Sequence, residues 1–324
     1  MPKHSALQKR PYSTQNWLKK LCVRLGALVL AFSITYPGQS FFAWACYELG
    51  FNDRRTDTGL LEVHIIDVGK ADAIMIRCEE HAALIDAGKP VSAGTVADYL
   101  VRNNVRSLDY LIMSHPDSDH IGGMPGLLNE IEVKAFVRAD TGYNSGEGSD
   151  LSALQGILKE KGIKTRSMKP GDGFILGTAV FTAVGPVRSF KDPNNSSLVL
   201  RMDCEGFSAL FCGDMEDDAE QALILSGQDI DVDLLKVGHH GSDTSSSFRF
   251  IWETSPRYAA VSTALDRNLL PRNEVLERLE DSGAEIYRTD TDGSIVFKYD
   301  GTDVRVRLDK EERTDYETVD NRPF

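Results

Sequence analysis

The sequence predicts an α/β fold with two mixed sheets covered by helices, which gives four layers. Short apolar or alternating runs typical of strands come first in succession and then mix with runs of helical spacing. Neither a Walker loop nor a G-x-G-x-x-G motif after the first strand is present, so a doubly wound nucleotide-binding fold is not favoured. Residues of the types that bind metal ions recur where apolar runs end.

The first half of the predicted domain starts with three strands separated by tight turns, over 61–67, 73–77 and 82–86. Apolar spacing indicates a helix over 95–103, and a short buried strand over 110–113 leads into a loop rich in His and Asp. We expect a helix at 124–130, a strand at 135–138 and a helix over 151–161 that ends at Gly162.

The second half alternates between the two kinds of element. Strands are expected over 179–184, 198–203, 208–212, 232–237 and 259–262, and helices over 217–225, 248–254 and 274–281. Strands over 286–288, 295–299 and 304–308 complete the pattern, so the predicted domain covers 60–308. The tail over 309–324 is charged and lacks apolar periodicity, which predicts disorder.

Composition describes an ordinary globular chain with an acidic surface. The chain has 324 residues and a formal net charge of −13, so it repels polyanions at long range unless local cations reverse the field. None of the five cysteines forms a C-x-x-C pair, which argues against a structural zinc knuckle. A disulfide between Cys204 and Cys212 is compatible with the sequence but not required by it.

The N-terminal 1–46 differ in kind from the rest. A stretch with six basic and no acidic residues precedes an uncharged run over 25–36, a pattern typical of an export signal. The run is shorter than the ~20 residues of a membrane helix, and an A-x-A pattern permits cleavage before Cys46. An uncleaved membrane anchor is the close alternative, and an N-terminal helix of the domain is the third. A polar linker over 47–59 follows, and we expect a secreted or membrane-anchored domain outside the cytoplasm.

Three clusters of ligand-type side chains follow predicted strands. Neutral imidazoles and carboxylates bind zinc, manganese and iron, and two neighbouring cations need a bridging carboxylate, for which Asp214 is the natural candidate. Each His taken singly could be a satisfied polar group in a core or turn, but the ordered series favours a metal site. The clusters are His115, Asp117, Asp119 and His120, then Asp214, then His239 and His240.

The segment HPDSDHIGG resembles the H-x-[HD]-x-D-H signature of the metallo-β-lactamase fold. Seven segments over about 60–308 resemble one branch, the metallo-β-lactamase-like domain of ComEC-type competence proteins, which the family places beside a DNA-uptake channel. They are HIIDVGKADA, LIDAG, SHPDSDHIGG, NNSSLVL, LFCGD, LKVGHHGS and YRTDTDGSI. The resemblance implies a four-layer αββα metallo-β-lactamase sandwich. Since the sequence lacks the long multi-helix membrane region of a DNA channel, we expect a stand-alone exported hydrolase domain.

The resemblance also implies roles for the ligand-type residues. His115 and Asp117 would hold the first metal, Asp119 and His120 the second, and Asp214 would bridge them. Either His239 or His240 would complete the second position. Asp119 would also orient the attacking water, so Asp119, Asp214 and His240 are the expected catalytic residues. Asp67 and Asp72 match acidic positions near the site, with turn capping after the first strand as the equal alternative.

Three departures from the family pattern bear on chemistry. Asp117 stands where most of the superfamily has His, as in the competence branch. The chain has no His between His120 and His239, so the first site could be weak or suited to Mn²⁺ or Mg²⁺. Lys70-Ala71 replaces Gln-Gly, which adds a cation that could meet a phosphate, and Leu270-Pro271 replaces His-Pro.

These features predict a hydrolase that uses two divalent ions, Zn or Mn, to activate water, with a phosphodiester as substrate and DNA within its range. Further cations are expected from Lys236 and from a basic segment over 159–169, interpreted as a solvated helix face and turn. The alternative is a non-catalytic module that binds metal or phosphate. The sequence does not indicate an oligomeric state. The expected substrate contacts are Lys70, Asn194, Asn195 and Ser242.

Overall fold

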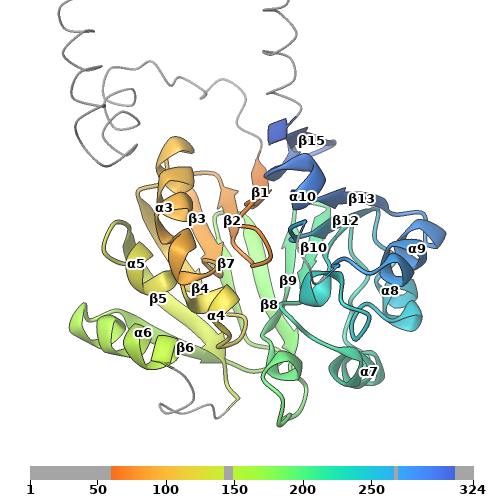
Figure 1. The fold of residues 1–324 in the computed structure, drawn as a ribbon, viewed down its shortest axis with the longest axis horizontal. Helices are drawn as coiled ribbons and strands as arrows, with labels where there is room; N and C mark the ends of the chain where they lie inside the picture. The colour runs from red at the N-terminus through yellow and green to blue at the C-terminus, as the bar shows by residue number, and fades with distance from the viewer. Residues whose placement is uncertain (1–59, 142–148, 266–268, 311–324) are drawn as a thin grey trace, which may run out of the picture. The chain divides into compact units, whose positions relative to one another are not determined.

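The structure is a computed structural model that describes residues 60–141, 149–265 and 269–310. Two mixed sheets pack face to face, and helices cover their outer faces (Figure 1). This is the four-layer α/β arrangement that the sequence predicts. The expected export segment, the linker and most of the charged tail lie outside the described residues, although the Asp309 amide is hydrogen-bonded to the Ser294 carbonyl at 3.0 Å.

The first sheet has eight strands in the order β15-β14-β1-β2-β3-β4-β5-β6. Strands β3 to β6 run parallel to one another, whereas β1, β2, β14 and β15 pair antiparallel. The bounds are β1 Leu61–Ile65, β2 Ile74–Cys78, β3 His81–Ile85, β4 Ser107–Ile112, β5 Glu132–Ala139, β6 Lys164–Met168, β14 Ile295–Tyr299 and β15 Val304–Leu308.

The second sheet has seven strands in the order β13-β12-β11-β10-β9-β8-β7. Strands β10 to β13 are parallel, and β7 to β10 pair antiparallel. The bounds are β7 Gly173–Leu176, β8 Ala179–Gly185, β9 Val199–Cys204, β10 Phe207–Phe211, β11 Leu234–Lys236, β12 Tyr258–Val261 and β13 Glu285–Arg288.

Helices bury apolar stripes on the outer face of each sheet. Against the first sheet pack α3 Ala93–Arg102, α4 Ser118–Ile121, α5 Met124–Leu127 and α6 Ser149–Glu160, and against the second pack α7 Asp217–Leu225, α8 Phe248–Thr254 and α9 Asn273–Asp281. The short elements are α10 Thr289–Asp292 and the 3₁₀ turns η2 Pro90–Ser92, η3 Asn194–Ser196 and η4 Gly238–Gly241. No helix within the described ranges combines the length and apolarity needed to cross a bilayer.

The central core lies between the two sheets. Inward-facing residues of both sheets, among them Val63, Ile76, Phe181, Phe211 and Phe297, are almost fully buried there. Because successive strand residues point to opposite faces, each central strand supplies one set of apolar side chains to this core and a second set to a helix layer. Strands buried on both faces therefore appear in the sequence as continuous apolar runs.

The sequence prediction was incomplete between 161 and 178, where the structure has strands β6 and β7. Strand β6 carries Lys164, Thr165, Arg166 and Ser167, all exposed, because it forms the edge of the first sheet. Charged residues on an edge strand discourage pairing with another chain, and they hide the apolar signal of a strand. The basic segment is thus partly a strand rather than a helix face and turn. The helix expected at 124–130 is a single turn, α5.

Candidate metal centre

The predicted ligands meet where the carboxyl ends of parallel strands from the two sheets face each other. Strand β4 ends just before His115, β10 ends before Asp214, and β11 ends before His239 and His240. Parallel strands in register end at the same sheet edge, and such edges support functional loops on a rigid base. The structure therefore brings together residues that lie more than a hundred positions apart in the chain.

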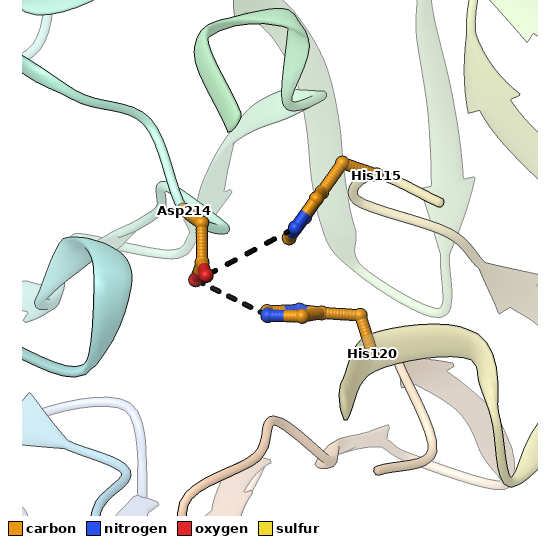
Figure 2. A group of neighbouring side chains, drawn as sticks. All are labelled: His115, His120 and Asp214. Carbon is orange, nitrogen blue, oxygen red and sulfur yellow. Dashed lines mark ion pairs between the residues drawn. The ribbon is translucent and has the colours of Figure 1, made fainter. Parts of the chain in front are cut away.

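Asp214 occupies the middle of the cluster and is almost fully buried. Its Oδ1 lies 3.2 Å from Nε2 of His120. Its Oδ2 lies 3.7 Å from Nε2 of His240, 3.8 Å from Nε2 of His239 and 3.9 Å from Nε2 of His115. Figure 2 shows the rings of His115 and His120 pointing at this carboxylate from the opposite strand layer. Four imidazoles thus converge on one carboxylate.

Two further carboxylates lie at the more exposed side of the cluster. The Asp117 Oδ2 atom lies 3.8 Å from Nε2 of His115, and the Asp119 Oδ2 atom lies 3.7 Å from Nε2 of His240. Ligand atoms of Asp119, His120 and His240 all lie within 4.8 Å of one another. This grouping joins His240 to the residues predicted for the second position, a choice that the sequence spacing left open.

The imidazoles of His120 and His240 are oriented by acceptors on their far side. The Nδ1 of His120 lies 2.8 Å from the Asp86 carboxylate, and the Nδ1 of His240 lies 3.0 Å from the Ser262 carbonyl. Since the carbonyl and the carboxylate accept these hydrogen bonds, each Nδ1 carries a hydrogen, and each Nε2 faces the centre, where it can bind a cation in place of a proton.

The other two imidazoles have similar partners. Nδ1 of His239 lies 3.0 Å from a Glu216 carboxylate oxygen, and Nδ1 of His115 lies 3.1 Å from the Ser114 hydroxyl. Sequence reasoning gave no role to Glu216, Ser114 or Asp86. The one available signal was the position of Asp86 within LIDAG, at the end of a predicted strand, close to where the candidate ligands lie after other strands.

Buried atoms without partners mark the centre as a cation site. Nε2 of His115, His120 and His240 and Oδ1 of Asp214 are buried and have no hydrogen bond of normal geometry within the described part of the chain. Buried polar atoms are nearly always satisfied in proteins, so such a cluster requires an explanation. Lone pairs of nitrogen and oxygen converging on one space are the donor set of a divalent transition metal.

The electrostatics also favour positive charge at this point. Burial alone would lower the pKa of His120, but the carboxylates of Asp214 and Asp86 outweigh it and raise that pKa well above its ordinary value. Burial would likewise raise the pKa of Asp214, yet the neighbouring imidazoles, led by His120 and His240, hold it well below the usual range. The carboxylate is ionised at neutral pH and ready to bind a cation.

Both ligand loops contain backbone positions that few residue types can occupy. His239 and His240 have φ values of 46° and 54°, in the left-handed region that non-glycine residues rarely adopt. Such positions cost on the order of 1–3 kcal/mol each and cluster at functional sites. Gly123, the second glycine of HIGG, packs so closely that a Cβ there would lie 2.1 Å from the Ala87 carbonyl oxygen.

The two acidic residues of the first loop have different roles. Asp67 accepts a hydrogen bond from the Gly69 amide at 3.2 Å, which is the predicted turn capping. Asp72 is instead buried, with its Oδ2 3.0 Å from Nζ of the fully buried Lys236 and its Oδ1 3.6 Å from Nδ1 of His240. The expectation that Lys236 is a cation available to substrate is therefore wrong, because the ion pair with Asp72 joins the two sheets behind the centre.

The predicted substrate contacts separate into two groups. Lys70 lies at the centre, with its Nζ 3.8 Å from Oδ2 of Asp119. Asn195 is buried and structural, since its Oδ1 accepts hydrogen bonds from the amides of Glu216 and Ala219 at the start of α7. Neighbouring Asn194 is partly buried in η3, and Ser242 is buried with its hydroxyl 3.0 Å from that of Thr244. In the sequence alone, Asn and Ser residues that cap helices or turns cannot be distinguished from those that contact a substrate.

Comparison with known proteins extends these observations. The chain is 33% identical over 260 residues to ComE operon protein 3 of Bacillus subtilis, covering 74% of this chain and 33% of that protein. It is 29% identical over 238 residues to competence protein ComA of Neisseria gonorrhoeae, covering 72% of this chain and 32% of that protein. The chain thus spans about a third of the length of the curated relatives it matches.

A solved structure shows the same fold. Igni18, a metallo hydrolase from the archaeon Ignicoccus hospitalis, superposes with a TM-score of 0.52 at 16% identity, covering 74% of this chain and 99% of that one. The model of the metallo-beta-lactamase superfamily matches residues 66–264, which include the whole ligand cluster. The four-layer fold, the converging imidazoles and this match agree, and the chain is a member of the metallo-beta-lactamase superfamily with a metallo-hydrolase fold.

Proposed function

We propose that the chain is a metal-dependent phosphodiesterase that uses two divalent ions. The observation that carries the proposal is the convergence of four imidazole Nε2 atoms on Asp214, each held by an acceptor or hydroxyl at its far nitrogen. An unpaired buried imidazole lone pair is costly unless a ligand satisfies it. A purely structural cluster would pair these atoms with protein donors.

The cluster divides into two ligand sets that share Asp214. Asp119, His120 and His240 form the second set, whose ligand atoms lie within 4.8 Å of one another. His115 and Asp117 remain for the first set. We assign His239 to that first set as well, because it is the imidazole of the cluster that remains once His120 and His240 are grouped with Asp119, and its Nε2 lies 3.8 Å from Oδ2 of Asp214. His239 would then take the place of the superfamily's middle metal-binding histidine, which this chain lacks between His120 and His239.

When bound, two divalent ions would supply a strong nucleophile from water at neutral pH and would stabilise charge on a phosphoryl oxygen. The chain itself supplies the hydrogen-bond acceptor that would orient this water. Asp119 is the least buried carboxylate of the second set, with 22% of its side chain exposed. Burial would raise the pKa of Asp119, but His240 and His120 together lower it, so the carboxylate is ionised and can accept a hydrogen bond from the attacking water.

Charge favours an anionic substrate. The three ligand carboxylates, Asp117, Asp119 and Asp214, balance all but one of the charges of two divalent ions. Lys70 adds a cation with 21% of its side chain exposed beside Asp119. A phosphodiester carries one negative charge and fits this balance, and Lys70 is the residue expected to contact its free oxygen. We propose a DNA phosphodiester as the natural class, which the competence names of the relatives support.

The test is hydrolysis of bis-p-nitrophenyl phosphate, linear DNA and RNA by metal-free full-length protein supplied with Mn²⁺ or Zn²⁺. We expect turnover that depends on metal and falls about 10³-fold or more in Asp214→Ala. Asp281→Asn is the matched control, because this carboxylate is exposed on α9 and lies outside the cluster. Protein that binds metal yet hydrolyses none of these substrates would contradict the proposal and favour a non-catalytic binding module.

We also propose that 1–46 direct the domain out of the cytoplasm, as an export signal or as a membrane anchor, with 47–59 as linker. Basic residues followed by a short apolar run support this. Fractionation of cells that express the full chain should place the domain outside the cytoplasm, and N-terminal sequencing should distinguish a cleaved signal from an anchor. Recovery of the full chain in the cytoplasm would refute it.

A further inference from the structure

Two cysteines face each other at the end of the sandwich opposite the metal centre. Strand β2 begins two residues after Asp72 and ends at Cys78, and strand β9 begins two residues after Ser197 and ends at Cys204. Since Asp72 and the Ser197 hydroxyl both belong to the surroundings of the centre, the cysteines lie at the far ends of these strands. Cys78 belongs to the first sheet and Cys204 to the second.

The two sulfur atoms share one small polar site. The Thr178 hydroxyl lies 3.3 Å from the sulfur of Cys78 and 3.6 Å from the sulfur of Cys204. Each thiol is also close enough to the other to shift its pKa. Both cysteines are free, and both belong to the core between the sheets. Two thiols that flank one hydroxyl across the sheet interface are neighbours, which is the first requirement for a disulfide between them.

The pair lies directly beneath the surface. Thr178 is exposed, and so are Glu79 and Glu205, which follow the two cysteines in tight turns. Both glutamates have positive φ values, 56° and 46°. A small opening of turns at strand ends needs little free energy compared with global unfolding, so a small reagent can reach the thiols without unfolding of the core.

We propose that Cys78 and Cys204 are a redox-active dithiol, which a low-molecular-weight disulfide oxidises to a disulfide that links the two sheets. This would be a covalent modification site independent of the proposed hydrolase activity. It also replaces the pairing of Cys204 with Cys212 that the sequence allowed, since Cys212 packs in the core between the second sheet and its helices.

The reaction is two successive thiol–disulfide exchanges. The Cys78 thiolate attacks one sulfur of the reagent disulfide and releases one small thiolate, which leaves a mixed disulfide on Cys78. Cys204 then loses its proton and attacks the Cys78 sulfur, so the second small thiolate leaves. The protein loses two hydrogens and two electrons, and the reagent disulfide becomes two thiols.

The surroundings of each sulfur support this order. The neighbouring Cys204 thiol is the main cause that lowers the pKa of Cys78 to about 6, even though burial opposes it. A thiolate is the attacking species in exchange. The same contact and burial raise the pKa of Cys204. Burial raises the pKa of Cys212 as well, so Cys212 serves as the internal control for an inert thiol.

The experiment treats the full chain with oxidised glutathione, blocks free thiols by alkylation and maps peptides without reduction. We expect a linked peptide pair that contains Cys78 and Cys204, while Cys212 remains alkylated. Cys204→Ser should stop the reaction at a glutathione adduct on Cys78. Oxidation should also raise the unfolding midpoint of wild type by several degrees, since the cross-link closes a long loop, and should leave the midpoint of Cys78→Ser unchanged.

Two outcomes would overturn the proposal. Wild-type protein in which Cys78 and Cys204 are both alkylated under every oxidant concentration would show that the thiols do not pair. Glutathione held on Cys78 of wild type without any linked peptide would show that Cys204 cannot reach it. Neither readout uses hydrolysis, so failure here is distinguishable from failure of the phosphodiesterase proposal.

Discussion

The molecule contains two buried polar clusters of similar composition and opposite character. The metal centre gathers imidazoles and carboxylates whose inner atoms have no hydrogen-bond partner within the described residues. The second cluster surrounds Glu62 on the outer face of β1. There the carboxylate oxygens lie 2.6 Å from the Arg77 guanidinium and 3.1 Å from Nζ of Lys298. The first cluster presents lone pairs to a common space, whereas the second neutralises its charge with protein cations.

Proton positions in the Glu62 cluster show the same difference. Burial is the main cause that lowers the pKa of His64 and raises that of Tyr99, so both are neutral. The Tyr99 hydroxyl can donate to Nδ1 of His64 at 3.0 Å, and Nε2 of His64 then donates to Glu62 at 3.2 Å. Here both nitrogens of the imidazole have protein partners. At the candidate metal centre, by contrast, Nε2 of His115, His120 and His240 has no hydrogen bond of normal geometry within the described residues.

Asp214→Ala should give the largest effect, because it changes the feature that distinguishes the metal centre from the Glu62 cluster. It removes the shared carboxylate of the centre, so we expect loss of bound metal and a fall in turnover of about 10³-fold or more, which is ~4 kcal/mol. Metal that binds only the folded state stabilises it, so a chelator should lower the unfolding midpoint of metal-loaded wild type and leave Asp214→Ala unchanged. Metal analysis and thermal unfolding measure both effects. Full metal retention in the variant would contradict the assignment.

Glu62→Gln tests the second cluster in the same way. The change leaves Arg77 and Lys298 without their buried counter-charge, so we expect the free energy of unfolding to fall by about 3 kcal/mol. Bound metal and turnover at a temperature where the protein is folded should equal wild type. Urea titration and metal analysis check the two halves of the expectation. A drop in metal content of the folded variant would mean that the clusters are coupled.

Asp86→Asn tests the role of the hydrogen-bond acceptors that lie behind the imidazoles of the centre. We expect metal affinity to fall about 10- to 100-fold, because the carboxylate behind a ligating histidine sets its orientation and basicity. Asn suits the test, since Asp86 has a φ of 59°, a conformation that Asn tolerates well. Competition with a coloured chelator measures the affinity, and Glu62→Gln is the control. Unchanged metal affinity in the variant would show that Asp86 has only a packing role.

The smallest expected effect is a difference in pH dependence. Burial by itself would raise the pKa of Glu62, but His64, Arg77 and Lys298 together lower it from 4.5 to about 2. Because the folded-state pKa is depressed, this contribution is complete above pH 4.5 and is lost as pH falls toward 2. The wild-type free energy of unfolding should therefore fall by up to about 1.4 kcal/mol per pH unit more than that of Glu62→Gln in this window. Parallel curves for the two proteins would refute the assignment.

Local patterns in the sequence predicted most of the fold and the candidate metal ligands. The short apolar runs within 82–86, 110–113 and 208–212 predict strands, and β3, β4 and β10 lie there with bounds shifted by a few residues. Strand β6 was missed because an edge strand needs no apolar face. The candidate ligands stand out in the sequence because they follow strands directly and their chemistry is specific to residue type.

Tertiary structure alone decided how those residues act. His239 and His240 are adjacent and equivalent in sequence, but the backbone turns Nε2 of His240 toward Asp119. Asp72, Lys236 and Asn195 resemble surface or substrate residues in sequence, and packing buries all three in ion pairs or caps. The physical reason is that hydrophobic periodicity encodes which face of an element is buried, whereas the partner of a polar atom depends on distances between elements far apart in the chain.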